Sequence, residues 1–156
     1  NMAVELLRWA HIVGATVLIG TGAGIAFFML MSHRTQDPRL IAHTASIVVL
    51  ADWVFTASAV VAQPVTGVWL AIELGWELTE FWIAASIGLY MLIGAFWLPV
   101  VWIQHRMMQL AVEAANNQQA LPEQYQRLFR LWFWCGVPAF LSIMLLLWLM
   151  VSRPTW

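Results

Sequence analysis

Residues 12–31, IVGATVLIGTGAGIAFFMLM, form an unbroken run without an ionisable side chain. A transmembrane helix needs about 20 predominantly apolar residues, so this run alone indicates a membrane span. Toward the N-terminus the apolar segment continues to about Val4, and it takes in Arg8 and His11 on the way. The alternation typical of a β-barrel strand is absent, so we expect the span to be an α-helix.

Three more apolar segments of similar length follow, separated by a polar turn, an acidic connection and a loop at 113–124 that is rich in Asn and Gln. The predicted spans are residues 4–31, 39–72, 81–110 and 125–151. With 62% hydrophobic and 10% charged residues in a chain of 156, no room remains for a soluble domain. We therefore predict an all-α, four-helix membrane bundle that forms a single domain over residues 1–156, embedded in a lipid bilayer.

Further features concern helix shape and placement in the membrane. Pro64, Pro99 and Pro138 fall inside three of the predicted spans and should bend them. Most of the 11 tryptophans, Trp156 among them, fall near segment ends, where interfacial anchors lie. The Arg residues concentrate in the first and third connections, so the positive-inside rule predicts that both termini face away from the cytoplasm.

The overall charge excludes some classes of function. The formal net charge is −1 and every basic residue is Arg, so a nucleic-acid-binding patch and lysine chemistry are both unsupported. The single cysteine, Cys135, lies in an apolar run and should pack as a small hydrophobic residue.

The first span carries a histidine at membrane depth with small residues beside it. Gly14 and Gly22 lie on nearly the same helical face as His11, and Arg8 lies one turn earlier. This face could pack closely against another helix, or against a second copy of the chain, with His11 merely hydrogen-bonded. It could also let a flat macrocycle approach, with imidazole as an iron ligand and Arg8 near a propionate, or His11 could relay protons.

The second span holds a polar stripe of Asp52, Thr56 and Gln63, which share one face of an ideal helix. Asp52 is the only acidic residue deep within a span. The stripe is equally consistent with an interhelical hydrogen-bonding seam and with a path for a proton, an ion or a small solute.

The other three histidines, His33, His43 and His105, all fall at the opposite membrane boundary from His11. His43 and His11 should differ by about 20 Å in depth at 1.5 Å rise per residue, which is too far for one shared iron. A second haem or metal site at this boundary is an open alternative to histidines that simply lie at headgroup level. Their spacing matches no metal-binding motif.

Several short motifs resemble those of an uncharacterised family of small bacterial integral membrane proteins, a domain of unknown function. The motifs are Leu7–His11, Leu18–Met29, Val49–Trp53, Gln63–Gly67, Phe129–Phe133 with Val137-Pro138, and Arg153-Pro154, and they span nearly the whole chain. The resemblance implies a multi-pass protein of the bacterial inner membrane, with both termini periplasmic by the Arg distribution.

More remotely, the layout is similar to HemJ-type protoporphyrinogen oxidases and to CopD-type copper-resistance membrane proteins. The HemJ resemblance implies haem b with His11 as an axial ligand, because that type has an essential histidine in its first span, and His33 falls near its second. The chain departs from the type in lacking a Lys near Ile83–Ser86 and in having Gly136 where the type has a carboxylate.

Two hypotheses result. The first is a b-type haem protein in membrane redox chemistry or haem metabolism, which could act as an oxidoreductase with a redox partner or quinone. The second is a non-enzymatic membrane subunit or a copper or small-solute permease that uses the polar stripe around Asp52.

Overall fold

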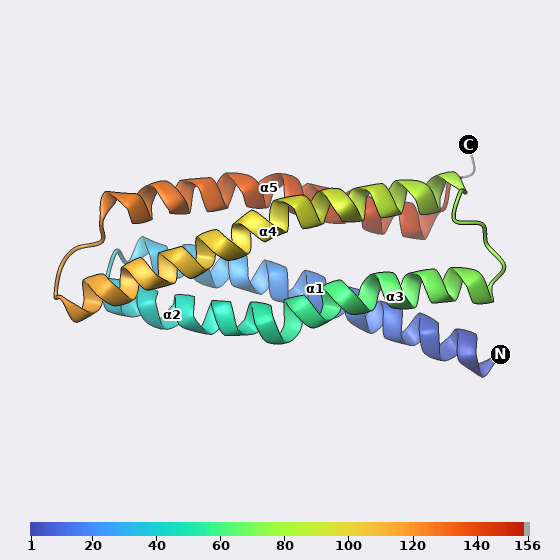
Figure 1. Cartoon of the computed structure of the whole chain (residues 1–156), viewed down its shortest axis with the longest axis horizontal. Helices are drawn as coiled ribbons and strands as arrows, with labels where there is room; N and C mark the ends of the chain where they lie inside the picture. The colour runs from blue at the N-terminus through green and yellow to red at the C-terminus, as the bar shows by residue number, and fades with distance from the viewer. Residues whose placement is uncertain (155–156) are drawn as a thin grey trace.

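The computed structural model describes residues 1–154, and Trp156, one of the predicted interfacial anchors, lies outside them. The described chain consists of helices joined by short connections (Figure 1). Their bounds are α1, Met2–Arg34; α2, Pro38–Ala51; η1, Asp52–Thr56; α3, Ala57–Glu73; α4, Phe81–Asn116; and α5, Glu123–Ser152. Because α2, η1 and α3 are continuous, they make one span, and the described residues contain four helices long and apolar enough to cross a membrane. The predicted all-α, four-span fold is confirmed.

Local capping explains where the first two helices begin. The side chain of Asn1 accepts a hydrogen bond from the Ala3 amide at the start of α1. The side chain of Asp37 accepts one from the Arg39 amide at the start of α2, and Pro38 occupies the first turn. Such caps satisfy backbone N–H groups that have no partner within the helix. Proline in the first turn sacrifices no helical hydrogen bond, because the N–H group that it lacks would have had no partner there.

The predicted element boundaries need two corrections. The predicted loop at 113–124 is too long, because α4 continues through Asn116 and α5 already begins at Glu123. The predicted turn after the first span is also shorter, because α1 continues through Arg34. Polar side chains at both sites led to an early boundary, although helices that leave the bilayer tolerate polar residues in their last turns.

The four spans lie side by side, and each runs antiparallel to the span before it, so that α1 and α5 end at opposite ends of the bundle (Figure 1). The connections 35–37 and 117–122 lie at one end, here called the loop end. The chain start, the connection 74–80 and the last turn of α5 lie at the other, here called the terminal end. Helix α4 packs mainly against α5 and α2, and α1 packs mainly against α3 and α2.

The buried core is concentrated near the loop end, where α1, α2, α4 and α5 meet. Its members are Ile25, Met29, Ile41, Ala45, Val48, Ile103, Met107, Leu110, Ala111, Tyr125, Phe129 and Trp132. Across the rest of the bundle many large apolar side chains are exposed, which is the pattern of a surface in contact with lipid tails.

The middle of the second span is not an ordinary α-helix. Asp52–Thr56 form the π-helix η1, in which the Ala57 amide bonds the Asp52 carbonyl five residues back. Such turns are rare and are frequent at functional sites. No sequence pattern predicts this π-helix, and it changes which residues of this span face the bundle interior.

Candidate functional site

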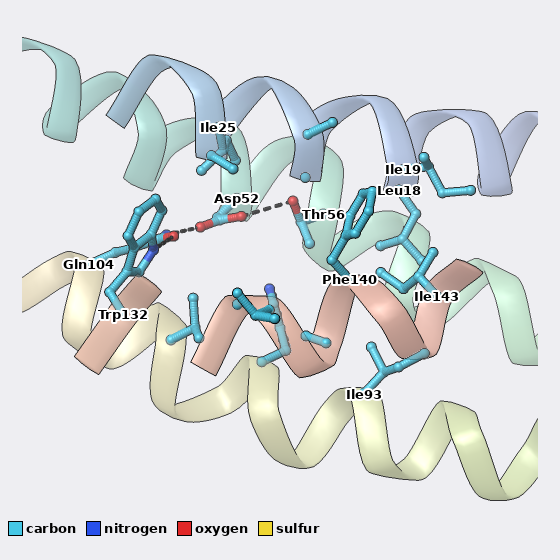
Figure 2. Close-up of a pocket in the computed structure, with 18 of the residues that line it drawn as sticks. Leu18, Ile19, Ile25, Asp52, Thr56, Ile93, Gln104, Trp132, Phe140 and Ile143 are labelled. Carbon is cyan, nitrogen blue, oxygen red and sulfur yellow. Dashed lines mark hydrogen bonds between the residues drawn. The ribbon is translucent and has the colours of Figure 1, made fainter. Parts of the chain in front are cut away.

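A buried hydrogen-bonded chain joins η1, α4 and α5 near the middle of the bundle (Figure 2). Asp52 is only 6% exposed. The Thr56 hydroxyl donates to Asp52 Oδ1 over 2.9 Å, and the Gln104 amide donates to Asp52 Oδ2. Trp132 Nε1 in turn donates to Gln104 Oε1 over 2.9 Å. The predicted Asp52–Thr56 pair is thus part of a larger network to which two other helices contribute.

Trp132 fixes which atoms donate and which accept in this hydrogen-bonded network. An indole nitrogen can only donate, so the Gln104 atom that faces Trp132 is the amide oxygen. The amide nitrogen of Gln104 then faces Asp52 and donates to it. Together with the Thr56 hydroxyl, this makes Asp52 the acceptor on which the donated hydrogen bonds converge.

A cavity of about 520 Å³ adjoins this network and is bounded by all four spans. Its lining is almost entirely apolar, and its polar groups include Asp52, Thr56 and Gln104. Helices α1 and α5 form opposite walls, as the close-up shows with Leu18, Ile19 and Ile25 on one side and Phe140 and Ile143 on the other (Figure 2). Several aromatic residues contribute to the walls: Phe27, Tyr90, Trp97, Trp132, Phe133 and Phe140.

Glycines help to keep this space open. Gly22, Gly94 and Gly136 line the cavity, one each from α1, α4 and α5, and a Cβ added at any of them would meet no atom within 4 Å. Gly22 was predicted to lie beside a haem at His11; it lines this cavity, whereas His11 does not. The larger side chains of most other residues would occupy part of this volume.

His11 lies away from the cavity, in the contact between α1 and α3. Its Nδ1 hydrogen-bonds Thr66 Oγ1 at 2.8 Å, and the ring is half-buried. The imidazole packs on Gly67, where an added Cβ would lie 3.0 Å from His11 Cε1. One turn further along, Gly14 is covered by the side chain of Gln63, so that a Cβ at position 14 would overlap it.

This arrangement bears directly on a haem at His11. The Thr66 contact leaves Nε2 as the nitrogen available to a metal, which suits a ligand. However, His11 does not line the cavity, and its ring lies on Gly67. Arg8 is exposed and Gly14 is filled by Gln63. As the helices are packed, these residues do not fit a macrocycle beside His11.

The polar stripe predicted on the second span is divided between two places. Asp52 and Thr56 face the cavity, whereas Gln63 lies against α1 with its Oε1 buried and without a hydrogen-bond partner among the described residues. On an ideal helix the three would share a face. The wider π-helical turn at Asp52–Thr56 changes the register, and Gln63 is turned toward Gly14 instead.

The histidines near the loop end have separate surroundings. His33 stacks on Phe129, with centroids 3.4 Å apart, and its Nδ1 is 3.2 Å from the Tyr125 hydroxyl. His43 is exposed beside a shallow groove, and His105 is exposed and contacts Gln109. Residues 1–154 contain no group of three or more His, Cys, Asp or Glu side chains placed to hold a metal ion.

Three contacts of this region were missed from the sequence. Gln104 bonds Asp52 and Trp132 bonds Gln104 from helices far away along the chain, and no local pattern marks either residue. The Tyr90 hydroxyl donates to the Val60 carbonyl, and here a signal existed. Pro64 has no N–H to bond the carbonyl four residues earlier, so a donor from a neighbouring helix was to be expected at Val60.

Comparison with known proteins identifies the family of this chain. No curated protein and no solved structure is significantly similar to this chain. A family described as a predicted integral membrane protein matches residues 5–154, which is nearly the whole chain and agrees with the four apolar spans of the fold. The chain therefore belongs to the DUF2269 family of predicted integral membrane proteins.

Proposed function

We propose that this membrane protein binds a small amphipathic molecule that enters from the lipid, with its apolar body in the central cavity and its polar group at Asp52. One observation carries the proposal: a buried carboxyl group, held by Thr56 and Gln104, borders an otherwise apolar cavity of about 520 Å³. The function is then that of a carrier, a permease or the ligand-binding subunit of a membrane assembly.

Size and chemistry both support this proposal. Small-molecule pockets typically have volumes of about 300–1,000 Å³ and are mostly apolar, with a few polar groups that fix orientation. An ionisable residue at membrane depth is costly, so it usually has a functional reason. The Asp52 network keeps its carboxyl group fixed in the cavity wall rather than pairing it with an Arg elsewhere.

Filling the cavity is the direct test. Gly94→Leu places a side chain into the cavity, and Gly88→Leu on the same helix is a matched control, because neither glycine has an atom within 4 Å of an added Cβ and Gly88 does not line the cavity. We expect native mass spectrometry to detect a co-purified small molecule on the wild type and on Gly88→Leu, with a loss of about tenfold or more on Gly94→Leu. Equal occupancy of all three proteins would contradict the proposal.

Haem b at His11 is the second candidate, and it rests on the HemJ resemblance together with one contact. The hydrogen bond from His11 Nδ1 to Thr66 Oγ1 holds the ring and leaves Nε2 for iron. Binding would require α1 to separate from α3 at Gly67, as the packing there leaves no room. A redox partner or quinone, and a second site at His33, His43 and His105, depend on this candidate and stay predictions.

The proposed location is a bacterial inner membrane with the loop end in the cytoplasm. The loop end carries Arg34, Arg39, Arg106, Arg127 and Arg130, whereas the terminal end carries Arg8 and Arg153 with Glu73, Glu77 and Glu80. Excess positive charge marks the cytoplasmic side of a membrane protein. Association of copies through the glycine-rich part of α1 also stays a prediction.

A further inference from the structure

The hydrogen bonds of the Asp52 network limit what kind of group can be recognised there. Trp132 can only donate, which orients Gln104, and Gln104 and Thr56 then donate to different oxygens of Asp52. Hydrogen bonds donated to both oxygens of a carboxyl group favour its ionised form over its protonated form. In the ionised form the lone pairs that remain on Asp52 can only accept, so a ligand group that reaches them must be a donor.

The charge of this carboxyl group has no partner within the protein. Among residues 1–154, the oppositely charged side chains whose nitrogen and oxygen atoms lie within 4.0 Å of each other are Arg39 and Asp37, at the loop end. No Arg or His nitrogen of the described chain comes within that distance of Asp52, although the residue is 6% exposed. A buried charge is normally paired, because low polarity makes an isolated one expensive. Without a partner such a carboxylate tends to take up a proton, and a ligand that carries a positive charge would stabilise its ionised form.

The walls of the cavity suit a cation with a bulky apolar body. Trp97, Trp132, Phe133 and Phe140 line the cavity that Asp52 borders, and Tyr90 adds a further ring. The faces of aromatic rings carry partial negative charge and attract ammonium groups, while the rings also bury apolar surface. Asp52 would repel an anionic headgroup, and the Thr56, Gln104 and Trp132 donors beside it already bond Asp52 or Gln104.

We infer that the ligand is a lipophilic amine, in which a protonated ammonium group donates to Asp52 and the hydrocarbon or aryl body fills the cavity toward Leu18 and Ile143. This inference rests on the proposed function and names the ligand class of the same site. It separates amines from neutral alcohols, ketones and quinones, which supply no positive charge to Asp52.

Two probes of nearly equal shape test the ligand class: 1-adamantylamine and 1-adamantanol. Each is titrated by calorimetry into the protein in lipid nanodiscs, and empty nanodiscs give the contribution from partitioning into lipid. We expect the amine to bind the wild type at least about tenfold more tightly than the alcohol, which is typical of a close buried charge pair. Asp52→Asn should abolish this preference, while Asp52→Glu should keep most of it.

The outcomes separate the two proposals. If the alcohol binds the wild type as tightly as the amine, the amine inference is wrong and cavity binding stands. If neither probe binds while Gly94→Leu still removes the co-purified molecule, again only the amine inference fails. If the Gly94→Leu comparison shows no loss, the cavity proposal fails first. Circular dichroism establishes whether Asp52→Asn is folded, and if it is not, the wild-type comparison and Asp52→Glu decide the question.

Discussion

At the scale of single residues, His11 and Asp52 are both ionisable groups at membrane depth, yet their surroundings differ. His11 is held by Thr66 and lies on Gly67 between two packed helices. Asp52 is held by Thr56 and Gln104 at the wall of a cavity. A residue fixed beside an open volume can meet a ligand without movement of the helices, whereas a residue fixed within a helix contact cannot.

The haem prediction can be tested on single residues by spectroscopy. If His11 is an axial ligand, the detergent-purified wild type shows a Soret band that sharpens on reduction with dithionite, and His11→Ala loses it. Thr66→Val removes the acceptor that orients the ring, so we expect haem affinity to fall by about 10- to 100-fold. His105→Ala is the control, since His105 is exposed. A colourless wild type from haem-replete cells would rule the haem out.

Residues of the site could be predicted from the sequence only where a single position stands out within a span or follows from helical spacing. Asp52 could be found because a carboxyl group within a span stands out against apolar neighbours. Thr56 followed from helical spacing. Gln104 and Trp132 could not be found, because their role depends on which faces of α4 and α5 meet η1. Gln63 was placed on the wrong face because nothing in the sequence marks the π-helix.

At the scale of elements, proline and tyrosine form a pair between α3 and α4. Pro64 leaves the Val60 carbonyl without its usual backbone donor, and the Tyr90 hydroxyl bonds this carbonyl. An unsatisfied carbonyl inside a membrane bundle is costly because no water can replace the donor. The bond therefore joins two helices at a position where one of them has an incomplete backbone ladder.

A double-mutant cycle measures this coupling. Tyr90→Phe should lower the free energy of unfolding by about 1 kcal/mol, because the Val60 carbonyl is left unpaired. In a Pro64→Ala background the new amide at position 64 can bond Val60, so the same change should cost much less. The measurement is unfolding in mixed detergent micelles. If Tyr90→Phe lowered the free energy of unfolding equally in both backgrounds, the tyrosine would act through packing alone.

Helix boundaries were less predictable than helix number. Spans follow from apolar length, and all four were recognised for that reason. The end of α4 was placed too early, because residues 113–116 are polar or small yet still helical. There the helix has left the lipid-facing region, and the usual link between polarity and the end of a span no longer holds.

At the scale of the whole molecule, the two ends of the bundle differ in packing as well as charge. The core lies toward the loop end, where His33 of α1 stacks on Phe129 of α5. Beyond it α1 and α5 become opposite walls of the cavity. If the loop end faces the cytoplasm, the cavity and Asp52 lie on the outer side of the packed core.

Cysteine labelling in intact cells tests this orientation. Cys135 is first replaced by Ala, and single cysteines are then introduced at Glu77, in the terminal-end connection, and at Gln119, in the loop-end connection; both positions are exposed. By the Arg distribution, a membrane-impermeant maleimide should label Glu77→Cys in intact cells and Gln119→Cys only after permeabilisation. The reverse pattern would invert the protein in the membrane. Because the bundle itself would be unchanged, the cavity would then lie on the cytoplasmic side of the packed core.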